Sequence, residues 1–169
     1  MAAARPVVAL TDSLALHLNG DRLLALHAAD AHTSSDVVVR WSAADVVALG
    51  DIYWSWQYPA IDLGSGGSLA GMVAAVEGTL ARSTPRTVIV PGHGAPSGKA
   101  DLAAYRDMLV GVGRKVREAV ERGETLEAIL AAHPTAEFDE RFARPGAYVP
   151  PDEFVRCVYE DLTRAARGR

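Results

Sequence analysis

The chain has 169 residues, of which 49% are hydrophobic and 22% are charged. This balance excludes a disordered chain and predicts one globular domain over residues 1–169. The formal net charge is −4 and no basic block stands out, so we expect no nucleic-acid partner.

One cysteine, Cys157, excludes an internal disulfide and a cysteine-based zinc finger. We expect it to be a packed thiol on a helix. The N-terminal stretch M-A-A-A-R-P has no apolar segment long enough for a signal peptide or a membrane span. These features predict a soluble, cytoplasmic protein with no membrane partner. The many Ala, Arg and Gly residues favour a bacterial source.

The N-terminal part of the chain predicts strands. A short apolar run covers Pro6–Leu10, and apolar residues then alternate over 14–18. Asn19-Gly20 is a strong hairpin signal, because both central positions of a type I′ turn need positive φ. Residues 22–28 form the return strand of this hairpin.

Two more strands follow, each next to a polar residue that can bind a metal. Residues 37–41 form one strand, and the polar loop Asp30–Asp36 before it contains His32. The apolar run over 45–49 forms the next strand, which we expect to end at Gly50-Asp51. Asp51 is thus placed at a strand exit.

An aromatic-rich loop is expected over residues 52–63, where Tyr53, Trp54, Trp56 and Tyr58 fall close together. Such a loop can be a lip over a pocket, a packing plug or a contact surface. On the first of these interpretations Trp54, Trp56 and Tyr58 line a substrate pocket. The residue types favour an apolar or ring-bearing small molecule.

A glycine-rich stretch, Gly64 to Gly67, comes before a predicted helix over 68–83 with Ser68 as its N-cap. A glycine run before a helix can bind phosphate. This one lacks both the Walker lysine and the G-x-G-x-x-G spacing, so we do not expect a phosphate site.

Residues 87–90 read as a buried strand, which Pro91 and Gly92 should end. His93 then lies on the loop at the strand exit, where open α/β sheets place their chemistry. Three helices are predicted after it, over 100–122, 125–132 and 151–166. A loop separates the last two.

His32, Asp51 and His93 are therefore three potential ligands on three loops. Loops at one edge of a sheet converge in space, so a common site is physically reasonable. Two imidazoles and a carboxylate suit zinc, manganese or iron. We predict these residues as metal ligands and assign no further catalytic residue.

The ordered set A-H-T-S-S-D (31–36), G-D (50–51), Y-P-A-I-D-L-G-S-G-G-S (58–68) and P-G-H-G (91–94) resembles the later motifs of the metallo-β-lactamase-fold hydrolases. The resemblance runs from about residue 14 to the C-terminus. It implies an α/β fold with layered α+β character. The expected structure is half of an αββα sandwich, with a mixed sheet and C-terminal helices.

In that family the residue matching His32 binds the first metal, the one matching Asp51 binds the second or bridges both, and the one matching His93 binds the second. The resemblance implies that metal-activated water attacks an ester, amide, thioester or lactam carbonyl, or a phosphodiester. Zinc, or manganese or iron, is the implied cofactor.

The hallmark H-x-H-x-D-H motif of the family is missing from this sequence, and Ser35 stands where the family usually has glycine. Catalytic zinc normally has three protein ligands and an open position, so partial metal occupancy is expected. Half of a sandwich also leaves one sheet face uncovered. We therefore expect a partner, either another copy of the chain or a chain that supplies the missing N-terminal half.

Three functional hypotheses remain open. The first is a metal-dependent hydrolase module completed by another polypeptide. The second is a non-catalytic small-molecule-binding or interaction protein that kept the scaffold. The third is a self-sufficient mononuclear enzyme that uses His32, Asp51 and His93.

Overall fold

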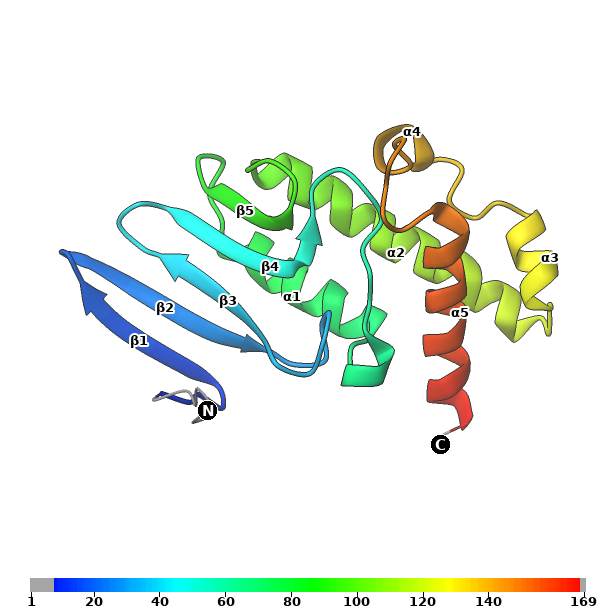
Figure 1. The fold of residues 1–169 in the computed structure, drawn as a ribbon, viewed down its shortest axis with the longest axis horizontal. Helices are drawn as coiled ribbons and strands as arrows, with labels where there is room; N and C mark the ends of the chain where they lie inside the picture. Colours follow the sequence, from blue (N-terminus) through cyan, green and yellow to red (C-terminus); the bar gives the residue numbers. More distant parts are fainter. Residues whose placement is uncertain (1–7, 168–169) are drawn as a thin grey trace, which may run out of the picture.

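The computed structural model describes residues 8–167. Strands and helices follow each other along the chain as drawn in Figure 1. The strands are β1 (Ser13–Leu18), β2 (Asp21–Ala28), β3 (Asp36–Trp41), β4 (Val46–Trp54) and β5 (Val88–His93). The helices are α1 (Leu69–Ala81), α2 (Lys99–Glu121), α3 (Leu126–Ala131), α4 (Asp139–Phe142) and α5 (Pro151–Arg167), with a short 3-10 turn at Leu63–Ser65.

Within residues 8–167 the strands form one five-stranded sheet in the order β1-β2-β3-β4-β5. Strands β1 to β4 are antiparallel neighbours, and β5 runs parallel to β4. The parallel pair needs a crossover, which α1 supplies. This mixed sheet with C-terminal helices confirms the predicted fold class, half of a metallo-β-lactamase-type sandwich.

The predicted hairpin is confirmed. Asn19 and Gly20 adopt φ of 51° and 79°, as a type I′ turn requires, and β1 pairs with β2 from Ser13↔Leu26 to Leu18↔Asp21. The apolar run before it is not a strand over residues 8–10, and its first two residues lie outside the described part of the chain.

Two predicted strand ends are wrong. Strand β4 does not stop at Gly50-Asp51 but continues to Trp54, with register shifts against β5 on both sides of Gly50. Strand β5 likewise continues through Pro91 and Gly92 to His93. Because β5 is the edge strand and the ladder is irregular here, Pro91 is tolerated although it cannot donate a ladder hydrogen bond.

The four predicted helices are present within a few residues of their predicted bounds, and the structure adds one helix that was not predicted. The side chain of Ser68 caps α1 by accepting from the amide of Gly71, and Thr125 caps α3 in the same way. The loop expected between α3 and α5 contains the short helix α4, whose Phe142 is buried. None of the helices in the described residues is long and apolar enough to cross a membrane.

The aromatic stretch is mostly a packing plug. Tyr53 and Tyr58 are fully buried, and the ring of Tyr58 stacks on that of Phe154 with centroids 5.2 Å apart. The hydroxyl of Tyr58 donates to Oδ1 of Asp139 at 2.7 Å. These contacts join the segment after β4 to α4 and α5, and they place Tyr58 in the core instead of in a pocket wall.

The two faces of the sheet differ in their surroundings. Helices α1 and α2 lie on one side, while the β1–β2 hairpin extends away from all the helices (Figure 1). The core-facing side chains, such as Val38, Val47 and Ile89, are buried. The register places a second set of side chains on the opposite face, which we call the open face. It comprises Leu14, Leu16, Leu18, Asp21, Leu23, Ala25, His27, Val37, Val39, Trp41, Val46, Ala48, Val88 and Val90.

All members of the open face are apolar except Asp21 and His27, yet within the described chain only Ala25 among them is buried. Leu18 is 57% exposed and Val88 42% exposed. This is the uncovered face that half of a sandwich is expected to have.

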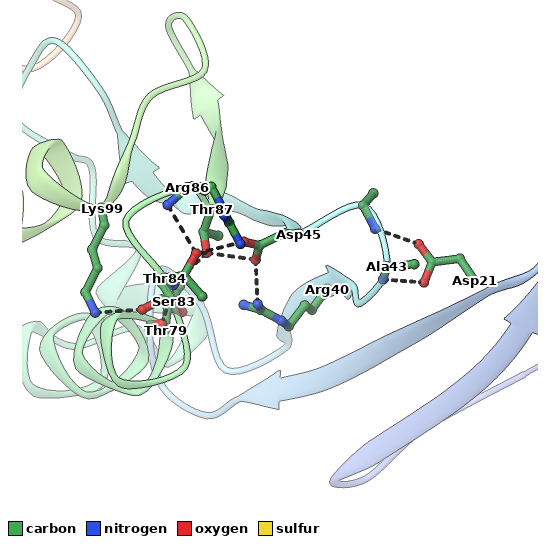
Figure 2. Close-up of polar contacts among 11 residues, drawn as sticks. Asp21, Arg40, Ala43, Asp45, Thr79, Ser83, Thr84, Arg86, Thr87 and Lys99 are labelled. Carbon is green, nitrogen blue, oxygen red and sulfur yellow. Dashed lines mark hydrogen bonds and ion pairs between the residues drawn. The ribbon is translucent and has the colours of Figure 1, made fainter.

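A polar cluster holds the start of β4, as Figure 2 shows. Both carboxylate oxygens of Asp45 accept hydrogen bonds, from Arg40 and Thr87 at Oδ1 and from Thr84 at Oδ2, all at 2.8 Å. These bonds, chiefly those from Thr87 and Thr84, lower the pKa of Asp45. The nearby Asp21 accepts from the amide of Ala43 at 2.7 Å. We call the contacts of Asp45 the Asp45 clasp; they tie the β3–β4 turn to the segment before β5.

Candidate metal site

The structure brings the three predicted ligands together at the far end of β4. His32 lies on the loop between β2 and β3, Asp51 lies within β4, and His93 is the last residue of β5. Nε2 of His32 is 3.9 Å from Oδ2 of Asp51, and Nε2 of His93 is 3.2 Å from Oδ1 of Asp51. The carboxylate therefore lies between two imidazoles, with one oxygen toward each.

The orientation of His32 is fixed by a backbone contact. Its Nδ1 lies 3.0 Å from the carbonyl oxygen of Ala60. Because a carbonyl only accepts, Nδ1 carries the proton, and in the neutral ring Nε2 keeps its lone pair toward Asp51. A ring nitrogen held by a carbonyl while the other stays free is the usual arrangement of a metal-binding histidine.

The loop that carries His32 is packed tightly. The carboxylate of Asp36 accepts from the amide of Thr33 at 2.6 Å, and the carbonyl of His32 accepts from the amide of Asp62 at 2.9 Å. A Cβ at Gly67 would lie 2.1 Å from that carbonyl oxygen. The glycine-rich stretch thus serves close packing against the His32 loop.

Glycine also allows β5 to approach Asp51. A Cβ at Gly92 would lie 2.3 Å from Oδ1 of Asp51 and 2.6 Å from the carbonyl carbon of Gly50. Real Cβ atoms do not come so close, so only glycine fits at position 92 without a shift of β4 or of the Asp51 side chain. The site therefore depends on a residue that has no side chain.

The accessibility of the three ligands increases from His32 to His93. Their side chains are 18% exposed for His32, 43% for Asp51 and 51% for His93. His93 is nevertheless covered on one side, because its ring packs on the indole of Trp54 with centroids 4.0 Å apart. The site opens to solvent, so a ligand has access to it.

The three aromatic residues assigned to a pocket have different positions. Trp54 is buried beside His93, and Trp56 is half-buried next to Gly94. Tyr58 points into the core and does not reach the surface. The positions of Tyr58 and Trp54 thus argue against a place in a pocket wall, and Trp56 alone of the three is partly accessible.

The chemistry of the donor set suits zinc, since two imidazoles and a carboxylate are common zinc ligands. The arrangement is not a finished site, however: nowhere in residues 8–167 do three His, Cys, Asp or Glu side chains form a group that could hold a metal ion. The residues present fit part of a metal site.

The single cysteine is a packed thiol, as expected. Burial raises the pKa of Cys157 to about 11, and its Sγ lies 3.5 Å from the carbonyl oxygen of Ile61. Both the burial and the contact with Ile61 are those of a thiol that packs inside the fold.

Several residues that build the site were not predicted from the sequence. The carbonyl of Ala60, 28 positions away from His32, leaves no signal in the sequence. The contact of Trp54 with His93 depends on strand pairing across the sheet. Gly92 did have a signal, because it directly precedes His93, but it was interpreted as a strand end.

The fold and this edge of the sheet together define the C-terminal half of a metallo-β-lactamase-type sandwich. Solved structures agree. A double mutant of the sec-alkylsulfatase PisA1 matches with a TM-score of 0.73 and 18% identity, over 93% of this chain and 26% of that one. The sec-alkylsulfatase Pisa1 from Pseudomonas sp. matches with a TM-score of 0.69 and the same identity and coverage.

Two metallo-β-lactamases match a smaller part of the chain. The BLEG-1 B3 enzyme has a TM-score of 0.55 and 20% identity, over 64% of this chain and 51% of its own. The enzyme from Pontibacter korlensis has a TM-score of 0.54 and 20% identity, over 63% and 50%. No protein-family model and no curated protein matches the chain.

The chain spans about a quarter of the alkylsulfatase and about half of each β-lactamase. At identities of 18 to 20% these likenesses establish the fold alone. The metallo-β-lactamase resemblance of the sequence is thereby confirmed at the level of the fold, and activity has to be argued from the site.

Proposed function

We propose that this chain is a metal-dependent hydrolase module in which His32, Asp51 and His93 supply part of a zinc site. The observation that carries this proposal is the position of Asp51, whose two carboxylate oxygens each face the Nε2 of a different imidazole. Such a carboxylate can bind one metal or bridge two. The fold, which the solved structures of hydrolases share, adds support.

Each residue has a distinct task in this proposal. His32 is held by the carbonyl of Ala60 with its free nitrogen toward the site. Asp51 lies between His32 and His93 and would share the metal with both of them. The more exposed His93 would bind it from the solvent side. Bound zinc would act as a Lewis acid that lowers the pKa of a water molecule. Manganese or iron suits the same donors.

The substrate we propose is a small molecule with a carbonyl or an acidic ester group. An ester, amide, thioester, lactam or phosphodiester meets this description. The names of the structural neighbours, an alkylsulfatase and β-lactamases, add a sulfate ester and favour the lactam. Half-buried Trp56, beside the site at Gly94, would contact an apolar part of such a substrate.

A partner completes the proposal. The open face is largely apolar and is uncovered in residues 8–167, and contiguous apolar surfaces of this kind mark association sites. We propose that another copy of the chain, or a chain that carries the missing N-terminal half, packs on it and completes the metal site.

Light scattering at micromolar concentration tests the partner proposal. We expect a dimer, or a stable complex with a complementing chain, that Leu16→Lys on the open face disrupts. Ala15→Lys, on the opposite face of the same strand, is the matched control and should leave the assembly intact. A well-behaved monomer that binds no complementing chain would contradict the proposal.

The metal site is tested by mass spectrometry of protein purified without chelator or affinity tag. We expect bound zinc, manganese or iron below one ion per chain, rising when the partner is present. His93→Ala should abolish it, whereas His133→Ala, at the end of α3, should not. Metal at one ion per chain in the isolated protein would favour a self-sufficient mononuclear enzyme instead.

The alternative is a non-catalytic binding or interaction protein that kept the scaffold. The incomplete donor set in the described residues is the observation that favours it. On this hypothesis Asp51→Ala and His93→Ala leave ligand or partner binding unchanged, while changes at Trp54 or Trp56 weaken it. The same variants under the hydrolase proposal lose metal.

A further inference from the structure

A single side chain contacts both Asp51 and His93. Trp54, the last residue of β4, is only 4% exposed. Its indole packs on the imidazole of His93 with centroids 4.0 Å apart and planes inclined by 33°. Its Nε1–H donates to the carbonyl oxygen of Asp51 at 2.9 Å. One interpretation of the sequence places Trp54 in a substrate pocket, but these contacts are directed at the candidate ligands Asp51 and His93.

The contact with His93 restricts a side chain that is otherwise free to move. Half of the His93 side chain is exposed, and an exposed imidazole normally occupies several rotamers. A flat indole at 4.0 Å removes the rotamers that point through it and leaves Nε2 beside Asp51. The strand pairing Trp54↔His93 keeps the two residues in register.

The contact with Asp51 fixes the backbone of the bulged segment. Strand β4 is irregular around Gly50, so the ladder with β5 does not fully define the direction in which Asp51 projects. The hydrogen bond from the indole of Trp54 to the carbonyl of Asp51, three residues earlier in the chain, further restricts the backbone at Asp51. Trp54 thereby acts on both ends of the contact between Asp51 and His93.

Trp54 is itself covered by the ring of Tyr148. The ring of Tyr148 stacks on the indole with centroids 6.2 Å apart and an interplanar angle of 29°. The amide of Tyr148 donates to Oε1 of the buried Gln57 at 2.8 Å. Tyr148 is 79% exposed, so it covers the indole from the solvent side.

We infer that Trp54 is a positioning residue that keeps the imidazole of His93 beside the carboxylate of Asp51, so that both donors are preorganised toward one metal. This inference rests on the proposed function, since it concerns the same site. It predicts that the indole raises metal affinity by preorganising the two ligands, as partners behind metal ligands commonly do.

The test compares Trp54→Phe and Trp54→Ala with the unmodified protein. Phenylalanine keeps a ring against His93 but loses the bond to Asp51, and alanine loses both. With zinc titrated by calorimetry, we expect affinity to fall up to about tenfold in Trp54→Phe and about 10- to 100-fold in Trp54→Ala. Phe154→Leu, a buried core change elsewhere, should lower the melting temperature but leave zinc affinity within about twofold.

A second measurement needs no metal. In the metal-free protein the indole should shift the NMR signals of the His93 ring protons upfield, because they lie over an aromatic face. Trp54→Ala should abolish this shift, Trp54→Phe should reduce it, and Phe154→Leu should keep it. Unchanged His93 signals in Trp54→Ala would overturn the inference, as would a loss of zinc affinity in Phe154→Leu equal to that in Trp54→Ala.

The two measurements separate this inference from the proposed function. If the unmodified protein bound no zinc, with or without its partner, the hydrolase proposal would fail. The shift of the His93 signals would then still decide whether Trp54 positions that ring: its loss in Trp54→Ala would support the positioning role and its persistence would refute it.

Discussion

Strand β4 has an aspartate near each end, and the two differ in how completely they are bonded. Asp45, just before the strand, accepts three hydrogen bonds at 2.8 Å from an arginine and two threonines (Figure 2). Asp51, near the other end, faces two imidazole nitrogens at 3.9 and 3.2 Å. Asp45 is satisfied within the fold, whereas Asp51 keeps part of its capacity free.

This difference in bonding marks Asp45 as a structural carboxylate and Asp51 as a candidate functional one. Short bonds to donors that are held by the backbone or by neighbouring side chains stabilise the folded chain. Ion pairs of a partly exposed carboxylate contribute little to stability. Those of Asp51 nevertheless bring together three side chains of the kinds that bind a metal. The same residue type on the same strand therefore has two predicted roles, and mutations can test the contrast.

The largest effect on stability is expected from Gly92→Ala, next to Asp51. The added methyl group would overlap Oδ1 of Asp51 and the backbone of Gly50, so β4 or the Asp51 side chain must move, at a cost of about 3 kcal/mol. Urea unfolding measures this, with Gly98→Ala as a control because its Cβ would have no neighbour closer than 4.0 Å. Equal stability of the two variants would contradict the close approach.

Thr87→Val, in the Asp45 clasp, should give a smaller loss of stability. Thr87 is buried and its hydroxyl donates to Asp45, and valine keeps the shape but not the donor. Because the acceptor is a carboxylate, loss of this hydrogen bond should measurably lower the free energy of unfolding, by less than Gly92→Ala. Thr84→Val removes the more exposed donor of the clasp and is expected to cost less. The free energy of unfolding in urea, compared between the two variants, checks the order.

The Asp45 clasp should also be visible in the acid dependence of stability. Hydrogen bonds from Thr87 and Thr84 hold the pKa of Asp45 below its usual range. A carboxyl with a lowered folded-state pKa stabilises the fold above its unfolded-state pKa, about 3.9 for Asp, and this contribution is lost as pH falls through the folded-state value. Asp45→Asn should therefore lose stability at pH 7 and show a flatter decline below about pH 4.

The smallest effect on stability is expected from Asp51→Asn. Its contacts with His32 and His93 are long and partly exposed, so the free energy of unfolding should change by no more than about 0.5 kcal/mol. Metal binding should nevertheless be lost. A large destabilisation, measured in the same urea experiment as Thr87→Val, would mean that Asp51 is a structural residue like Asp45.

The sequence predicts the elements of the fold well where local signals agree. The Asn19-Gly20 turn, the Ser68 cap and the apolar stripe of α2 each depend on neighbouring residues alone. The ends of β4 and β5 were predicted wrongly because Gly50 and Pro91 are local stop signals. The parallel pairing of these strands overrides them.

The candidate ligands were also predictable, because His32, Asp51 and His93 lie in an ordered set of motifs. Their approach to one another is a property of the tertiary structure. It requires the crossover from β4 through α1 to β5, which places residues 42 positions apart in sequence next to each other.

The sequence by itself therefore determined the types and order of the elements, the half-sandwich fold and the three candidate ligand positions, since each follows from local patterns or from ordered motifs. Only the tertiary structure decided that Tyr58 belongs to the core, that Trp54 packs on His93, and that Asp45 is bonded while Asp51 is open. The physical reason is that these contacts join segments far apart in the chain, whose distance and orientation depend on strand register and helix packing.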